Sequence, residues 1–218
     1  YKYAENGYKL ILAARRKEKL DVLAQELEKK FHVPVLPLLL DVRERDTVKA
    51  MVSGLPDEWK NIDILVNNAG LALGLKPIHE GLEDDWDIMI DTNIKGLLYV
   101  SRAIAPGMVK RGKGHIINIG SIAGKQVYPK GNVYSATKHA VDALTKSMRL
   151  DLLEHGIRVS QVAPGAVETE FSMVRFKGDS DRAGKVYKGY TPLLAEDIAE
   201  AVYFVSSLPP RVNVNDIV

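Results

Sequence analysis

The run Ile62-Asp63-Ile64-Leu65-Val66, followed at once by Asn67-Asn68-Ala69-Gly70, decides the fold class. Short, nearly continuous apolar runs are typical of strands that are buried on both faces of a parallel sheet. The Asn- and Gly-containing stretch then ends the strand. A second run of this kind, Ile157-Arg158-Val159-Ser160-Gln161-Val162-Ala163, ends at Pro164-Gly165. Both runs predict a buried strand with a loop at its carboxyl end.

Strands and helices are predicted to alternate along the chain. The strands are Lys9–Ala13, Val33–Leu40, Ile62–Val66, His115–Ile119, Ile157–Ala163 and Val212–Val218. The helices are Glu18–Lys30, Arg43–Gly54, Leu82–Arg111, Val133–His155 and Glu196–Leu208. This alternation predicts an α/β fold in which helices cover a doubly wound parallel sheet. No repeat or linker interrupts the pattern, so we expect residues 1–218 to form a single domain.

The composition fits a folded enzyme domain. Thirty basic and 28 acidic residues give a net charge of +2, so no broad attraction to nucleic acid or to an anionic membrane is expected. No apolar run approaches the ~20 residues of a membrane span, and no signal-peptide pattern is present. The chain has no cysteine, which excludes disulfides, a thiolate nucleophile and a thiolate metal site. No metal site is predicted, and a cytoplasmic location is expected.

Three residues predict proton transfer to or from an alcohol oxygen. Tyr134 and Lys138 are four residues apart on a predicted helix, and Ser121 follows the strand His115–Ile119. Residues at i and i+4 share one helix face, so the Lys138 ammonium is predicted to lower the pKa of Tyr134, typically by roughly 1 to 3 units. Tyr134 would then act as an acid/base. The alternative is an ordinary amphipathic pair, with Ser121 as a turn or helix cap.

Further motifs accompany these residues: Asn68-Ala69-Gly70, Asn93 within Asp91-Thr92-Asn93-Ile94-Lys95-Gly96, and Pro164-Gly165. In this order, from about Lys9 to the C-terminus, the chain resembles the short-chain dehydrogenase/reductase family. The resemblance implies a Rossmann-like fold and a set of roles. Tyr134 would be the acid/base, Lys138 would lower its pKa and hold the nicotinamide ribose, and Ser121 would fix the substrate oxygen. Asn93 would keep a proton-relay water, unless it is a mid-helix residue that bonds to the backbone.

The resemblance also implies a dinucleotide site. Asn68, Ala69 and Gly70 would line the adenine ribose. The segment after the predicted strand Ile157–Ala163 would also contact the cofactor, through Pro164, Gly165, Val167 and Thr169. Of these, Thr169 would lie at the carboxamide of the nicotinamide.

The end of the first strand predicts which dinucleotide binds. NAD enzymes of this architecture place an acidic residue there, whereas a 2′-phosphate favours arginine. Here the strand ends Ala13-Ala14-Arg15-Arg16. We therefore expect NADP(H) to be the cofactor, although a solvated basic turn is the alternative. Asp41-Val42, at the end of the next strand, matches the family pair that meets the adenine, and Asp41 could equally cap the helix that follows.

No Gly-rich phosphate loop of the form G-x-G-x-x-G precedes the first strand. Tyr1–Gly7 instead looks like the end of a helix, with Asn6-Gly7 as its cap. Following the family pattern, we expect about 25 to 35 further N-terminal residues that would supply a central strand and this loop. Without that strand, two inner sheet edges would be unpaired.

The segment between Gly165 and Thr191 is expected to form a lid over the substrate. It resembles the branch of NADP-dependent 3-hydroxy acid dehydrogenases that act on serine or allo-threonine. Arg175 is the candidate clamp for a substrate carboxylate, because arginine binds carboxylates bidentately. The alternative is that Arg175 belongs to a solvated lid face. The competing functions are a broad-range carbonyl reductase and a non-catalytic NADP(H)-binding scaffold.

The two longest predicted helices carry more apolar residues than one buried stripe needs. The resemblance implies that these helices build a homotetramer interface, and burial within the monomer is the alternative. The residues concerned are Ile94, Leu97, Leu98, Val100, Ile104, Val141, Leu144, Met148 and Leu152.

Overall fold

The computed structural model describes residues 1–218, apart from the side chains of Ala183 and Lys185. Every pair of neighbouring strands is parallel. Two strands, β1 (Leu10–Ala14) and β2 (Val35–Leu39), form one small sheet. The larger sheet has the order β3 (Ile64–Asn67), β4 (Gly114–Ile119), β5 (Ile157–Val162) and β6 (Asp216–Ile217). The predicted α/β class with parallel strands is confirmed.

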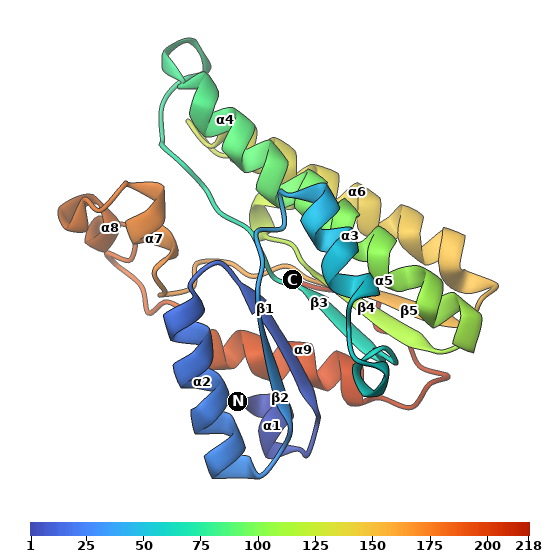
Figure 1. Ribbon diagram of the computed structural model, residues 1–218. Coiled ribbons are helices and arrows are strands. Elements are labelled where there is room, and N and C mark those ends of the chain that lie inside the picture. Colours follow the sequence, from blue (N-terminus) through green and yellow to red (C-terminus); the bar gives the residue numbers. More distant parts are fainter.

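Helices cover both faces of the sheets (Figure 1). One side carries α3 (Arg45–Ser53), α4 (Glu83–Ile90), α5 (Leu97–Arg111) and α6 (Asn132–Leu153). The other side carries α1 (Lys2–Glu5), α2 (Lys17–Phe31) and α9 (Ala195–Ser207). Two short helices, α7 (Phe171–Arg175) and α8 (Ser180–Lys185), follow β5 and extend away from the sheets. The arrangement is doubly wound.

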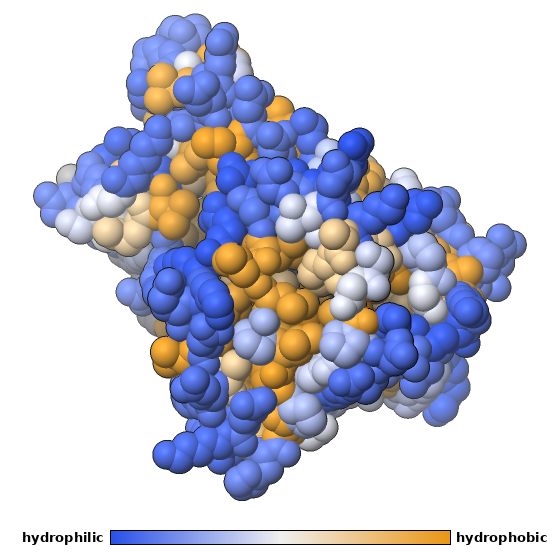
Figure 2. Space-filling view, viewed as in Figure 1, coloured by the Kyte–Doolittle hydropathy of each residue, from blue (hydrophilic) through white to orange (hydrophobic). Residues whose placement is uncertain are grey.

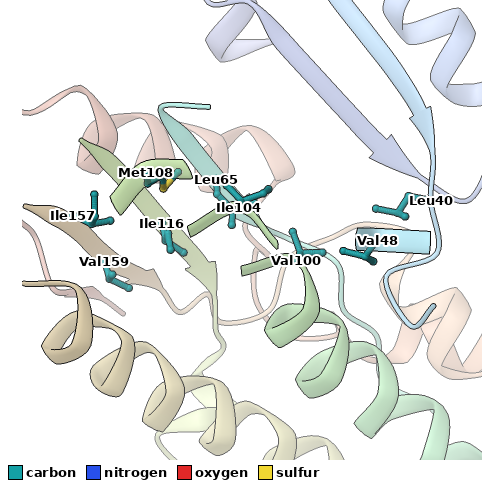
Figure 3. Packing of buried hydrophobic residues seen from close by; sticks show 9 residues of the cluster. All are labelled: Leu40, Val48, Leu65, Val100, Ile104, Met108, Ile116, Ile157 and Val159. Atoms are coloured by element: carbon teal, nitrogen blue, oxygen red, sulfur yellow. The ribbon is translucent and has the colours of Figure 1, made fainter. Parts of the chain in front are cut away.

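The main apolar core lies between the larger sheet and the helices α3 and α5 (Figure 3). Ile116 on β4 and Val159 on β5 are both fully buried there. Ile117 is equally buried but belongs to a second cluster with Val202 and Val205 of α9. Successive residues of a strand point to opposite faces, so the pair Ile116 and Ile117 shows that β4 is covered on both sides. This burial explains its nearly continuous apolar sequence.

The two sheets are not hydrogen-bonded to each other. In the part of the chain that the structure describes, no strand pairs with the second edge of β1 or with the second edge of β3. Two unpaired inner edges are what the sequence predicts. Figure 2 has the same view as Figure 1. It shows hydrophobic side chains gathered along the middle of the molecular face seen there, with hydrophilic residues around them.

Two predicted elements differ from the structure. The helix expected at Leu82–Arg111 is divided by a π-helical segment, Asp91–Gly96. The strand expected at Val212–Val218 is wrong for most of its length, because only Asp216 and Ile217 pair with β5. Residues 212–215 form no strand, and Val212 closes a turn through the bond from its amide to the Pro209 carbonyl. Among the described helices, none combines the length and apolarity that crossing a bilayer requires.

Candidate active site

The predicted site residues follow the carboxyl ends of five parallel strands. Parallel strands present these ends at the same edge of a sheet, which is where ligands bind in open α/β folds. The first predicted site residue after each strand is Arg15 after β1, Asp41 after β2, Asn68 after β3, Ser121 after β4 and Pro164 after β5. Tyr134 and Lys138 reach the same edge from the first turns of α6.

Ser121, Tyr134 and Lys138 are brought together as the sequence predicts. The Ser121 hydroxyl lies close enough to the Tyr134 phenol to act on its pKa, in the lowering direction. The Ser121 hydroxyl also accepts a bond from the Ala123 amide at 3.1 Å, so the capping role and the site role coexist. Lys138 Nζ lies 6.0 Å from the centre of the Tyr134 ring and donates to the Ile119 carbonyl at 2.9 Å. The ammonium is thus held at the end of β4, behind the phenol.

The predicted effect of Lys138 on Tyr134 is wrong for this geometry. The pKa of Tyr134 is raised, because burial of the phenol outweighs the opposing effects of the Ser121 hydroxyl and of the positive charge of Arg175. Burial also lowers the pKa of Lys138 to about 8. Burial in the tertiary structure is therefore the largest influence on the pKa of both side chains, and the i,i+4 spacing carries no information about it. Tyr134 therefore holds its proton more tightly than a free phenol does in this setting.

A close approach of backbone segments fixes Ser121 relative to Lys138. Gly124 ends the short 3-10 turn Ile122–Gly124 that follows Ser121. A Cβ at Gly124 would lie 2.5 Å from the Lys138 carbonyl oxygen, which is closer than any real side chain allows. Glycine is therefore required here, and it lets the turn pack directly on α6.

Asn93 lies in the π-helical segment and is 2% exposed. Its Oδ1 accepts from the Leu71 amide at 2.9 Å, and its Nδ2 donates to the Leu71 carbonyl at 2.8 Å and to Thr137 Oγ1 at 3.0 Å. The side chain thus ties the loop after β3 to the helix that carries Tyr134. The Asn93 side chain thus bonds to the backbone, as the alternative interpretation predicts. Its role in holding a proton-relay water stays a prediction. π-Helical turns are frequent at functional sites.

A buried polar network that the sequence does not reveal holds the ends of β3 and β4 in place. Asn67 Nδ2 donates to Ser101 Oγ and to Asn118 Oδ1, both at 2.9 Å. Asn118 Nδ2 in turn donates to Thr145 Oγ1 at 2.9 Å. Buried amides of this kind are stable only when satisfied. The network joins two strands to α5 and α6, so it fixes where Ser121 emerges.

Of the cofactor residues predicted after β1 and β2, Arg16 and Asp41 have charged partners. Arg16 is the N-cap of α2 and binds Glu170 at 2.8 Å. For Arg15, no hydrogen bond or ion pair is recorded within the described residues. Asp41 accepts a bidentate bond from Arg43, which lowers the pKa of Asp41, and it is not the cap of α3. Val42 packs against the main core.

The predicted residues after β3 form an exposed loop next to Asn93 and Lys138. Asn68, Ala69 and Gly70 are exposed. A Cβ at Gly70 would lie 3.4 Å from Asn93 Oδ1 and 3.5 Å from Lys138 Nζ. Glycine keeps this space open next to the lysine. This exposed loop and the arginines after β1 together fit an anionic dinucleotide.

The residues after β5 lead into the lid. The Pro164 carbonyl accepts from the Ile122 amide at 2.9 Å, which places Pro164 and Gly165 beside the loop of Ser121. Val167 forms an isolated parallel bridge with Leu193. Thr169 Oγ1 accepts from the Phe171 amide at 3.2 Å. Phe171 packs edge-on against the Tyr134 ring at 5.7 Å, a contact that the sequence does not predict.

Arg175, at the end of α7, lies next to Tyr134. Its guanidinium carbon is 5.7 Å from the centre of the Tyr134 ring. Nε donates to the Gly74 carbonyl at 3.1 Å, and Nη2 donates to Tyr128 Oη at 2.8 Å. Nη1 has no recorded partner in the described part of the chain. Tyr128 was not among the predicted site residues, because a loop tyrosine carries no sequence signal for this contact.

A cavity of about 160 Å³ adjoins Arg175 on the lid side. Its lining is strongly basic, with Asp85 as the one acidic member, paired with Lys177 at 2.8 Å. Tyr134 and Ser121 do not line it, but Arg175 both lines it and lies against Tyr134. The basic lining residues are Lys76, Lys130, Arg175, Lys177 and Arg182.

A parallel α/β sheet with a serine, a tyrosine and a lysine at its carboxyl edge defines a class: oxidoreductases that use a dinucleotide cofactor. The family described as short chain dehydrogenase matches residues 1–180. The chain belongs to this family.

Similar proteins share most of their length with this chain. An NADP-dependent 3-hydroxy acid dehydrogenase, YdfG, from Salmonella typhi is 51% identical over 217 residues, which are 99% of this chain and 86% of the relative. Sulfoacetaldehyde reductase 2 from Chromohalobacter salexigens is 44% identical over 98% of this chain and 84% of its own. The structure of a serine dehydrogenase in its closed form with NADP⁺ superposes with a TM-score of 0.93 at 49% identity, covering 99% and 86% of the two chains.

Proposed function

We propose that this protein is an NADP(H)-dependent oxidoreductase that acts on a small 3-hydroxy acid such as serine or allo-threonine. The observation that carries the proposal is the cluster of Ser121, Tyr134 and Lys138 at the carboxyl edge of the sheet, beside the partly buried Arg175 of the lid. The relatives named as 3-hydroxy acid and serine dehydrogenases support it.

The proposed roles combine the geometry of the site with those that the resemblance to the family implies. Tyr134 exchanges a proton with the substrate oxygen, accepting it when the alcohol is oxidised and donating it when the carbonyl is reduced. Ser121 donates a hydrogen bond to the same oxygen. Lys138 supplies positive charge behind the phenol and holds the ribose, and Asn93 supports the proton path. When bound, NADP(H) supplies or accepts the hydride. Arg15, Arg16, Asp41, Val42, Asn68, Ala69, Gly70, Pro164, Gly165, Val167 and Thr169 would hold it.

The substrate is proposed to be anionic. Arg175 lies against Tyr134 and lines a cavity with four further basic residues, so a carboxylate there is favoured electrostatically. A carboxylate on Arg175 would turn the β-hydroxyl towards Tyr134. A panel of small 3-hydroxy acids, sugars, steroids and aromatic ketones, assayed with NADP⁺ or NADPH, tests the assignment. A clear preference for neutral ketones would favour a carbonyl reductase, and no turnover of any member would favour a binding scaffold.

We expect NADP(H) to be used with at least tenfold higher catalytic efficiency than NAD(H), equivalent to about 1.4 kcal/mol. The reason is the basic turn after β1, where Arg15 and Arg16 offer donors to a 2′-phosphate and no acidic residue offers an acceptor to a ribose hydroxyl. Steady-state kinetics with both cofactors at a saturating hydroxy acid measure the ratio. Equal efficiency would contradict the cofactor assignment.

We also expect a homotetramer in the cytoplasm. Leu97, Val100, Ile104 and Val141 of the apolar set are buried within the chain, so they do not support an interface. Leu98 of the set stays 37% exposed, and on α6 Leu150 and Leu153 are 74% and 69% exposed. Light scattering at micromolar concentration should give about four times the chain mass. A monomer would contradict the proposal, since these leucines would then face water.

A further inference from the structure

Glu170 joins the lid to the turn after β1. Its Oε2 accepts from Arg16 Nη2 at 2.8 Å, and its Oε1 accepts from Lys19 Nζ at 2.9 Å. The two cations hold the pKa of Glu170 at about 2, so the carboxylate is charged. Figure 1 shows the result: α7 lies beside the beginning of α2, although more than 150 residues separate them in sequence.

This contact occupies the donors that a cofactor phosphate would need. A carboxylate and a phosphate are recognised by the same guanidinium fork and the same ammonium group. Arg16 is one of the two arginines assigned to the 2′-phosphate. Arg16 is the N-cap of α2, and Lys19 lies in the first turn of that helix. All three side chains of the bridge are about 60% exposed. Exposed pairs of this kind are individually weak, so a dianionic phosphate could displace the carboxylate.

The neighbours of Glu170 connect it to the reacting end of the site. Thr169 precedes it and is assigned to the nicotinamide carboxamide. Phe171 follows it and packs against the Tyr134 ring. Residues 169–171 therefore connect the basic turn after β1 with Tyr134. A change at Glu170 is expected to alter the position of the lid over the cofactor site and over Tyr134.

We propose that Glu170 is a specificity-determining residue that competes with the cofactor 2′-phosphate for Arg16 and Lys19. This inference rests on the proposed use of NADP(H). Glu170 neutralises the basic turn in the free protein and yields its two donors to the phosphate on binding. Dinucleotides without the phosphate do not need these donors, so the competition lowers affinity for NADP(H) alone.

The variant Glu170→Gln tests the competition, with Glu168→Gln as the matched control. Glu168 is also exposed and loses the same charge, but no ion pair is recorded for it among the described residues. Binding is measured by calorimetry with 2′,5′-ADP, with 5′-AMP and with NADPH and NADH. These probes need no turnover, and 2′,5′-ADP isolates the phosphate site from the nicotinamide end.

Glu170→Gln removes both of these exposed pairs, each of which is weak, so it should tighten 2′,5′-ADP and NADPH about three- to tenfold. Affinity for 5′-AMP and NADH should stay within about twofold, and Glu168→Gln should leave all four nearly unchanged. Unchanged or weaker 2′,5′-ADP binding by Glu170→Gln overturns the proposal, as does equal tightening by both variants. If the wild-type protein itself does not prefer 2′,5′-ADP over 5′-AMP, the cofactor assignment fails first, and the role of Glu170 fails with it.

Discussion

Tyr134→Phe is expected to lower kcat by at least about 100-fold while the dissociation constant for NADPH stays within a few-fold. General acid–base groups typically contribute 10² to 10⁴ in rate, and the phenol oxygen is the group that would exchange a proton with the substrate. The ring itself stays, so its edge-on contact with Phe171 and the packing of α6 are preserved. Steady-state kinetics and NADPH fluorescence titration measure the two quantities separately.

Tyr128→Phe is the matched control, because it removes a phenol hydroxyl from the same site. That hydroxyl accepts a hydrogen bond from Arg175. We expect Tyr128→Phe to change KM more than kcat. If Tyr134→Phe keeps more than a tenth of the wild-type turnover, the acid/base lies elsewhere. If both variants lose NADPH binding, the effect is structural and not chemical.

The sequence predicts most of the site because its signals are local. The apolar runs that end at Asn68, Ser121 and Pro164 mark where buried strands stop, and parallel pairing brings those ends together. The i,i+4 spacing of Tyr134 and Lys138 likewise fixes their shared helix face. Each of these inferences needs only a few consecutive residues, and the structure agrees with all of them.

The remaining features depend on the tertiary structure. The raised pKa of Tyr134 comes from burial by other elements, so the helix spacing predicts the wrong direction. The π-helical segment around Asn93 is invisible because the apolar pattern continues through it. The contacts of Glu170 with Arg16 and of Arg175 with Tyr128 join residues 154 and 47 positions apart. Nothing in either local sequence specifies the partner.

Arg175→Ala is expected to raise KM for a 3-hydroxy acid tenfold or more and to spare a neutral carbonyl substrate. A charge-assisted pair with a carboxylate in a partly buried site is worth about 1.5 to 3 kcal/mol, which corresponds to more than tenfold. The neutral substrate makes no such pair, so its KM should change little. Steady-state kinetics with one substrate of each kind, at saturating NADPH or NADP⁺, give the comparison.

Arg175 also ties the lid to the Gly74 carbonyl, so a loss of lid order must be distinguished from a loss of charge. Lys177→Ala serves as the control, because Lys177 lines the same cavity but pairs with Asp85. If the cavity charge as a whole attracts the substrate, Lys177→Ala should raise KM for the acid nearly as much as Arg175→Ala. If Arg175 is the clamp, only its own variant should separate the acid from the neutral substrate. Equal losses with both substrates would mean that Arg175 orders the lid, and the carboxylate would then have to bind elsewhere in the crevice.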